Sequence, residues 1–199
     1  MNRVRLALAT AGACLLAAGI GLYAARGGDS PSATGQFAGA TRPPAIPPTR
    51  FALRDQDGRA VTAAALRGRP AIVSFLYTTC RDTCPLIADQ VRGALDQLDR
   101  DRVPYVAVSV DPANDTPARA KSFLLKHGLT GRARFLLGSR DQLEPVWRQF
   151  GIQPQLGANR DHTPSTVLLD ERGVQRVGFM ADQITPEGVA HDVRALNSD

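Results

Sequence analysis

The sequence predicts an α/β domain, with a mixed central β-sheet covered by helices on both faces. Two continuous apolar runs of strand length, 71–77 and 103–110, predict buried central strands. A helical pattern follows each run, as expected for parallel strands joined by crossover helices. Towards the C-terminus, strand patterns at 166–170 and 174–179 are joined by the short turn 171–173, and they predict an antiparallel hairpin in the same sheet.

The individual elements are predicted from apolar spacing, turns and caps. The first two strands flank Asp-Gln-Asp-Gly at 55–58, a hairpin turn. Two helices are expected to begin where a threonine N-cap precedes proline, at 116–117 and 185–186. In chain order, we expect strands over 51–54, 60–62, 71–77, 103–110, 134–137, 166–170 and 174–179, and helices over 85–98, 117–127, 142–150 and from 186 onward.

An apolar segment precedes this domain. The twenty residues 6–25 carry no charge and are long enough to cross a bilayer as a helix. We therefore expect 1–26 to be a single-pass membrane anchor, with a cleaved signal sequence as the alternative. Arg3 and Arg5 precede the apolar run, which favours a short inner tail and an outward domain. The expected location is a bacterial inner membrane, with the domain facing the periplasm or cell exterior.

The segment that follows the anchor has the composition of a linker. Residues 27–50 are rich in Gly, Pro, Ser and Ala, which predicts a mobile tether. The folded domain is then expected over 51–199. The chain has a formal net charge of +5, with its Lys and Arg scattered rather than clustered. Because no motif for reading bases accompanies them, we expect no nucleic-acid partner.

The most informative residues are two cysteines, Cys80 and Cys84, the only ones in the predicted domain. They lie at the turn from strand 71–77 into helix 85–98, at the carboxyl end of a central strand. Open α/β sheets commonly place their chemistry there, and a thioredoxin-like fold fits this arrangement. A helix N-terminus favours thiolate over thiol. The spacing permits a disulfide or a soft metal site, whereas a structural bridge this short would constrain little chain.

Two thiolates alone make an incomplete metal site, so a third ligand is expected among the three histidines. His127 ends a helix and His191 lies within one, and both are expected at the surface. His162 precedes strand 166–170, where a loop histidine can reach the sheet edge beside the cysteines. Two sulfurs and an imidazole suit copper, whereas structural zinc would require a fourth protein ligand, and none is evident.

Three segments resemble the Sco/SenC family of copper-binding proteins. They read FLYTTCRDTCP at 75–85, YVAVSVDPANDTP at 105–117 and DHTPSTVLLDERG at 161–173. The resemblance covers nearly all of 51–199. It implies a thioredoxin-like fold and delivery of a copper ion to the Cu-A centre of cytochrome c oxidase.

The resemblance also assigns roles to individual residues. It implies that Cys80, Cys84 and His162 are the copper ligands. The implied partners are the oxidase subunit that carries the Cu-A site and a reductant that keeps the thiols reduced. Asp111 and Asp115 match an acidic segment of the family, and we interpret them as turn and helix-cap residues.

The same two cysteines are also compatible with a second class of function. The alternative prediction is a thiol-disulfide oxidoreductase, with Cys80 as nucleophile and Cys84 as resolving residue. The spacing is one residue longer than in thioredoxin, and no tryptophan precedes the first cysteine. We therefore expect a copper chaperone rather than an enzyme, and His162 separates the two hypotheses, because only copper binding requires it.

Overall fold

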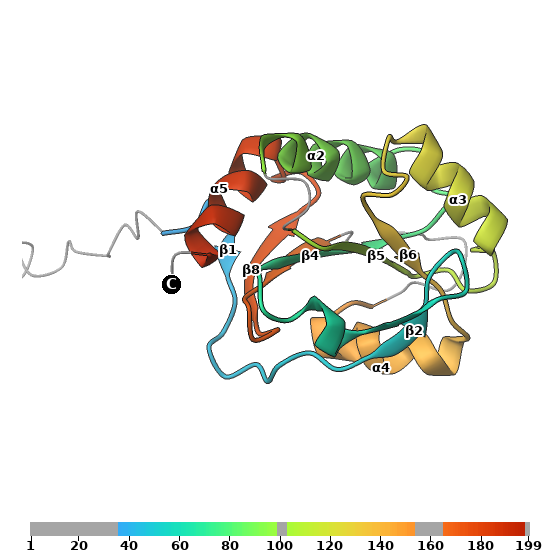
Figure 1. Cartoon of the computed structure of the whole chain (residues 1–199), viewed down its shortest axis with the longest axis horizontal. Helices are drawn as coiled ribbons and strands as arrows, with labels where there is room; N and C mark the ends of the chain where they lie inside the picture. Colours follow the sequence, from blue (N-terminus) through green and yellow to red (C-terminus); the bar gives the residue numbers. More distant parts are fainter. Residues whose placement is uncertain (1–35, 99–102, 154–164, 198–199) are drawn as a thin grey trace, which may run out of the picture. The chain divides into compact units, whose positions relative to one another are not determined.

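A mixed six-stranded sheet forms the centre of the molecule (Figure 1). The computed structural model describes residues 36–98, 103–153 and 165–197. In spatial order, the strands are β1 (Ala40–Thr41), β8 (Gln175–Met180), β7 (Ser165–Leu169), β4 (Ala71–Leu76), β5 (Tyr105–Ser109) and β6 (Arg134–Leu136). In this part of the chain no helix is long and apolar enough to cross a membrane, and the predicted anchor at 1–26 lies outside it.

Strand direction in the sheet follows the predicted order of elements. β4, β5 and β6 are parallel neighbours, whereas β7 and β8 form an antiparallel hairpin that pairs with β4 through β7. All residues of β4 are buried, as its continuous apolar run predicts. The mixed sheet is therefore confirmed, and the carboxyl ends of β4 and β5 lie side by side, because Leu76 pairs with Ser109.

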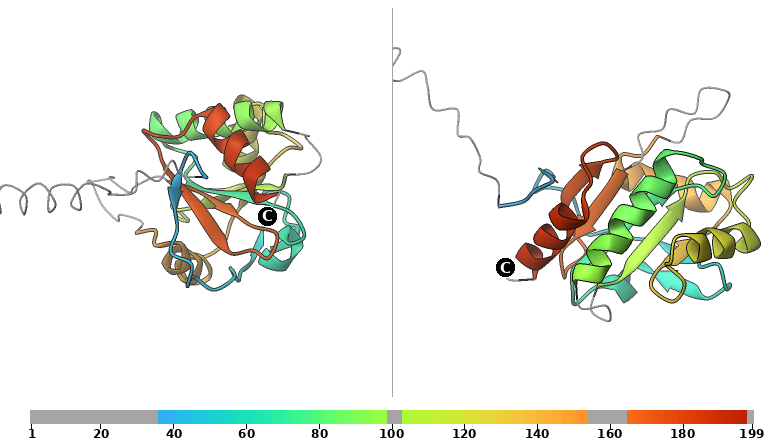
Figure 2. Two further views of the ribbon diagram at one scale, coloured as in Figure 1. Left: turned by 90° about the vertical axis from the view of Figure 1, so that its left-hand side faces the viewer. Right: turned by 90° about the horizontal axis from the view of Figure 1, so that it is seen from above.

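Helices cover both faces of this sheet, as predicted. α2 (Thr83–Gln97), α3 (Pro117–Lys126) and α5 (Pro186–Leu196) lie on one face, and α4 (Arg140–Phe150) lies on the other (Figure 1). α2 and α5 pack against each other along their length (Figure 2). Alternate residues of the strands supply two apolar cores, one beneath α2 and α5 and one beneath α4.

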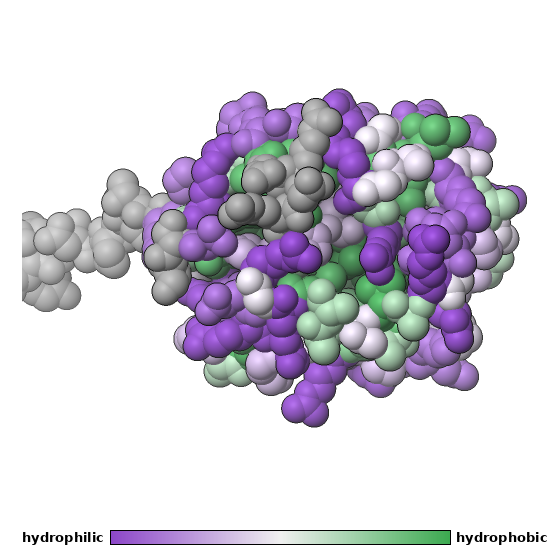
Figure 3. All heavy atoms as spheres, in the orientation of Figure 1, coloured by the Kyte–Doolittle hydropathy of each residue, from purple (hydrophilic) through white to green (hydrophobic). Residues whose placement is uncertain are grey.

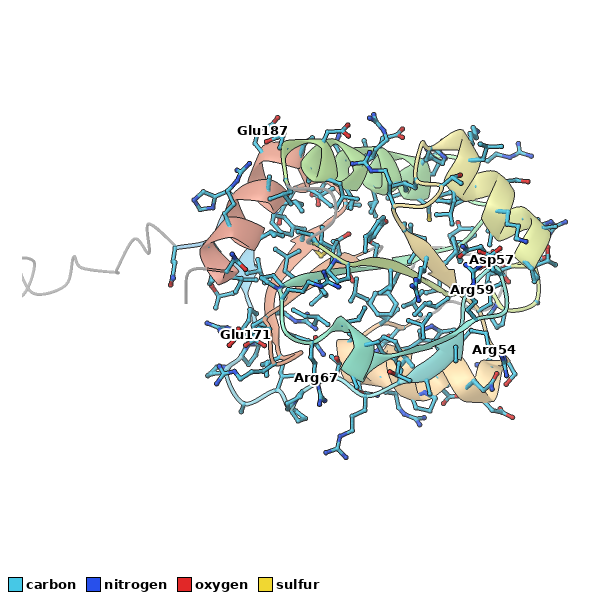
Figure 4. All side chains as sticks on the ribbon, in the orientation of Figure 1. Arg54, Asp57, Arg59, Arg67, Glu171 and Glu187 are labelled. Carbon is cyan, nitrogen blue, oxygen red and sulfur yellow. The ribbon has the colours of Figure 1, made fainter. Side chains whose placement is uncertain are left out.

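The predicted N-terminal hairpin is also present. β2 (Ala52–Arg54) pairs with β3 (Ala60–Thr62) and leads into a 3-10 turn, Ala63–Leu66. In Figure 4, Asp57 and Arg59 of this hairpin lie close together, and their side chains form an ion pair of 3.5 Å.

A hollow of about 700 Å³ lies between this hairpin and the start of β5. Its lining includes Val61 and Ala65 on the hairpin side, and Val103 and Pro104, which precede β5. Apolar residues lie among hydrophilic ones on the face of the molecule that Figure 3 shows. Because this hollow is at the amino end of β5, it lies at the opposite end of the sheet from the carboxyl end of the parallel β4.

The domain begins earlier than predicted. The compact unit starts at Gln36, so residues 36–50, which were assigned to the tether, belong to it. The amides of Ala38 and Gly39 donate to the buried carboxylate of Asp192 at 2.7 and 2.9 Å. β1 then pairs with β8. The sequence does not predict this attachment, because hydrogen bonds of the backbone, rather than an apolar run, attach residues 38–41 to the domain.

Candidate metal centre

The two cysteines lie at the junction of β4 and α2. β4 ends at Leu76 and α2 begins at Thr83, two residues before the predicted start. Cys80 lies in the turn between them and is partly exposed. Cys84 lies in the first turn of α2 and is fully buried. Both are free thiols, so the protein presents one accessible and one buried sulfur.

A hydrogen bond joins the pair. The backbone amide of Cys84 donates to Sγ of Cys80 at 3.2 Å. This amide is among the first N–H groups of α2, which have no partner within the helix. A sulfur that accepts from a helix N-terminus is favoured as an anion. The prediction that the two cysteines lie together at the helix start is therefore confirmed.

The two sulfurs differ in their affinity for a proton. A hydrogen bond from the Cys84 side chain lowers the pKa of Cys80 to about 5, against the opposing effect of burial, and the Cys84 amide adds to the lowering. The same hydrogen bond, together with burial, raises the pKa of Cys84 well above its usual range. At neutral pH the pair therefore holds one proton, with Cys80 as thiolate and Cys84 as thiol.

This arrangement supports two kinds of chemistry. A thiolate is the nucleophilic and metal-binding form of cysteine, so Cys80 is prepared for either role. A soft metal ion would displace the proton of Cys84 and bind both sulfurs. Alternatively, Cys80 can attack a disulfide and Cys84 can resolve the mixed disulfide that forms.

The predicted third ligand, His162, lies outside the residues that the structure describes, so its role stays a prediction. The first residue of β7, Ser165, is within them. β7 runs antiparallel to β4, and Thr166 pairs with Ser74 near the end of β4. Ser165 consequently lies at the end of the sheet from which the chain enters the cysteine turn.

The other two histidines occupy different environments. His127 was expected at the surface, but it is only 7% exposed, and this prediction is wrong. Its ring lies against Phe123, with Nδ1 2.9 Å from a carboxylate oxygen of Asp89 on α2. The imidazole therefore contacts both α3, through Phe123, and α2, through Asp89. His191 is confirmed as a surface residue, since its side chain is 60% exposed.

Neither of these histidines lies in a metal-binding cluster. Within residues 36–98, 103–153 and 165–197, no group of three or more His, Cys, Asp or Glu side chains could hold a metal ion. The described part of the chain therefore supplies two candidate ligands, Cys80 and Cys84.

Sequence reasoning missed the role of Asp115, which was interpreted as a helix-cap residue. Thr116 is the N-cap of α3, and its hydroxyl accepts from the amide of Arg119. The Asp115 carboxylate is instead buried, and it accepts from the amide and hydroxyl of Thr78, two residues before Cys80. Its position just past the carboxyl end of a predicted central strand was the available signal.

Comparisons with known proteins agree with this fold. The family model described as SCO1/SenC matches residues 39–198. Protein SenC of Rhodobacter capsulatus is 30% identical over 154 residues, which cover 72% of this chain and 67% of that protein. An SCO2-like protein of Rickettsia felis is 28% identical over 146 residues, which cover 69% of this chain and 71% of that protein.

Solved structures also resemble this chain. Bradyrhizobium japonicum ScoI with copper bound is 31% identical, with a TM-score of 0.60, over 74% of this chain and 97% of that chain. Apo Sco1 of Thermus thermophilus is 26% identical, with a TM-score of 0.67, over 80% of this chain and 96% of that chain. The family model spans most of the chain, and the fold, the paired cysteines and these relatives agree with it: the chain belongs to the SCO1/SenC family.

Proposed function

We propose that this protein is a membrane-tethered copper chaperone that delivers copper to the Cu-A centre of cytochrome c oxidase. The ion would be held by Cys80, Cys84 and His162. The observation that carries the proposal is the sulfur pair, in which the Cys80 thiolate accepts from the amide of Cys84 at 3.2 Å. The resemblance to ScoI with copper bound supports copper as the ion.

The chemistry of the donor set also favours copper. Thiolates are soft ligands that select Cu(I), and an imidazole is a suitable third donor. Because Cys84 is still protonated at neutral pH, binding of copper to both sulfurs releases a proton to solvent. The ion would therefore be bound more tightly as the pH rises above neutrality.

The fold supports His162 as the third ligand. His162 precedes β7, and the first residue of β7 lies at the end of the sheet where β4 leads into the cysteine turn. A histidine three residues before β7 would therefore be within reach of this end of the sheet. An imidazole at this position would complete a three-coordinate site without a ligand from elsewhere in the described chain.

Exposure of the two sulfurs suggests how copper would leave. Cys80 is partly exposed, whereas Cys84 has no exposed surface. An acceptor thiolate would first replace Cys80, and the buried Cys84 would release the ion last. The apolar segment 6–25 would keep the domain at the outer face of the membrane, and a thiol reductant would keep both sulfurs reduced.

Copper titration of the full-length protein in detergent tests the proposal. The dithiol form of the wild type should bind one copper ion, and the disulfide form should bind none. His162→Ala should weaken copper binding at least tenfold, yet it should retain a reversible disulfide between Cys80 and Cys84. His191→Ala is the matched control, because this imidazole is exposed and should leave copper binding unchanged.

Two outcomes would overturn parts of the proposal. Failure of the reduced wild type to bind copper at a one-to-one ratio would refute the chaperone function. Copper binding by His162→Ala as tight as that of the wild type would refute only the ligand assignment.

The second candidate function is thiol-disulfide exchange, and the low pKa of Cys80 favours it. In that case Cys80 would attack a disulfide of the oxidase subunit, and Cys84 would release the reduced partner by closing the intramolecular disulfide. The copper-deficient variant His162→Ala should then reduce a disulfide-bonded peptide that carries the Cu-A cysteines as fast as the wild type. Loss of this reaction in Cys84→Ala, with trapping of a mixed disulfide at Cys80, would identify the resolving residue.

A further inference from the structure

A buried carboxylate lies directly beneath the turn that carries Cys80. One oxygen of Asp115 accepts from the amide of Thr78 at 2.7 Å and from its hydroxyl at 2.6 Å. The other oxygen accepts from the hydroxyl of Ser109 at 2.5 Å. The side chain thus joins the segment after β4 to the end of β5, through three hydrogen bonds to a charged acceptor.

Asp115 is itself firmly held. Its amide donates to the carbonyl of Asp111 at 2.9 Å, and Ser109 is the last residue of β5. The carbonyl of Ser109 also accepts from the indole of Trp147 on α4 at 2.9 Å. The carboxylate is therefore tied to the strand and, through it, to a helix on the opposite face of the sheet, which makes it a rigid support.

The segment that Asp115 holds is short. Thr78 lies two residues before Cys80, and Thr79, between them, is exposed. Within this turn the amide of Cys80 donates to the carbonyl of Tyr77 at 3.3 Å, a long bond. Thr78 is therefore joined to Asp115 by two hydrogen bonds, and both are shorter than the bond within the turn.

We propose that Asp115 is a positioning residue for the thiol pair: by holding Thr78, it fixes the Cys80 backbone in the dithiol arrangement. This inference rests on the proposed function, because it concerns the sulfurs of the proposed copper site. In the dithiol arrangement, the sulfur of Cys80 accepts from the amide of Cys84 and is not bonded to the sulfur of Cys84. Closing the disulfide requires the two sulfurs to approach to about 2.05 Å, and the held turn resists that movement.

Asp115 acts on the cysteine turn through Thr78, which lies two residues before Cys80 and donates to the carboxylate with both its amide and its hydroxyl. A purely structural role would change only the stability of the domain, whereas a positioning role also changes the equilibrium between dithiol and disulfide.

The equilibrium between dithiol and disulfide tests this role. The full-length protein in detergent is equilibrated with reduced and oxidised dithiothreitol at pH 7 without copper. Oxidation forms one bond between the sulfurs of Cys80 and Cys84, and two electrons pass to oxidised dithiothreitol, whose disulfide breaks. The proton of Cys84 and one from the buffer complete the dithiol that forms.

We expect Thr78→Val to shift the equilibrium constant about tenfold towards the disulfide, which equals a change of about 30 mV in midpoint potential. Thr78→Ser retains the hydroxyl and should restore the wild-type value. Thr62→Val is the matched control. It removes one hydroxyl, which accepts from the amide of Ala65 at 3.3 Å, beside the hollow at the opposite end of the sheet.

A double-mutant cycle separates positioning from general destabilisation. Asp115→Ala alone should shift the equilibrium at least as far as Thr78→Val. The double variant should shift it no further than Asp115→Ala, because both changes break the same contact. Additive shifts would show that the two residues act independently and would overturn the inference.

Two other outcomes would also refute it. One is a wild-type midpoint potential in folded Thr78→Val, with folding checked by circular dichroism. The other is an equal shift in Thr62→Val. Since the measurement contains no copper, failure of the protein to bind copper would refute the proposed function and leave this inference standing.

Discussion

Replacing Cys84 by alanine removes the strongest influence on the acidity of Cys80. The hydrogen bond from the Cys84 side chain is the largest cause of the lowered pKa of Cys80, and the Cys84 amide, which the substitution retains, is a smaller one. We therefore expect the pKa of Cys80 to rise in Cys84→Ala, but not to reach the value of an ordinary cysteine.

The size of the change follows from the energy of such a bond. A hydrogen bond to a charged acceptor is worth about 1.5–3 kcal/mol, and 1.36 kcal/mol corresponds to one pH unit, so the pKa should rise by about 1–2. The thiolate forms as the pH rises through the pKa. The midpoint of Cys80 alkylation should therefore move from about 5 in the wild type to between about 6 and 7 in Cys84→Ala.

The assay is alkylation by iodoacetamide between pH 4 and 9. Peptide mass mapping separates Cys80 from Cys84 and from Cys14, the third cysteine of the chain, which lies in the apolar segment 6–25. The midpoint of the profile is compared rather than the rate at one pH, because a thiolate of higher pKa is also a stronger nucleophile. In the folded wild type Cys84 should stay unmodified throughout, since it is buried and its pKa is raised. Cys84→Ser is the matched control, because its hydroxyl can still donate to Cys80.

Two results would refute this reasoning. A wild-type rate that rises tenfold per pH unit between pH 6 and 8 would show an ordinary thiol with a pKa near 8.5. An unchanged midpoint in Cys84→Ala would show that the helix amide alone, rather than the neighbouring thiol, stabilises the Cys80 anion.

The remaining predictions concern the scaffold. Phe75→Ala should lower the free energy of unfolding by about 3–5 kcal/mol in urea denaturation, because Phe75 has no exposed surface and packs against Phe150; Leu125→Ala, at a side chain 72% exposed, should change it by less than about 0.5 kcal/mol. Asp192→Ala should lower the free energy of unfolding by roughly 1.5–3 kcal/mol for each hydrogen bond that is lost. It should also remove hydrogen-exchange protection from the amides of Ala38 and Gly39. Wild-type protection there would contradict the attachment.

Much of the sheet could be predicted because its signals are local. The runs 71–77 and 103–110 contain enough consecutive apolar residues to require burial on both faces, and threonine-proline pairs mark the starts of α3 and α5. Apolar residues at helical spacing predict the start of α2 at Pro85, whereas the helix begins at Thr83. This difference matters, because it puts Cys84 inside the first turn of the helix.

Burial of isolated polar residues could not be predicted. His127 follows α3 in a sequence that suits an exposed helix end, yet it packs against Asp89 of α2. The segment 36–50 has the composition of a linker, but Asp192, far away in the chain, accepts its amides. Both contacts join residues that lie far apart in the sequence, so no local pattern records them.

The sequence by itself determined that Cys80 and Cys84 lie together, because the two are only four positions apart at a strand-to-helix turn, whatever the rest of the chain does. Only the tertiary structure decided which sulfur carries the charge and what holds it. Burial of Cys84 in the core makes it the proton donor, and the meeting of two parallel strand ends brings Asp115 under Thr78. Acidity and position depend on three-dimensional neighbours, which spacing along a chain does not specify.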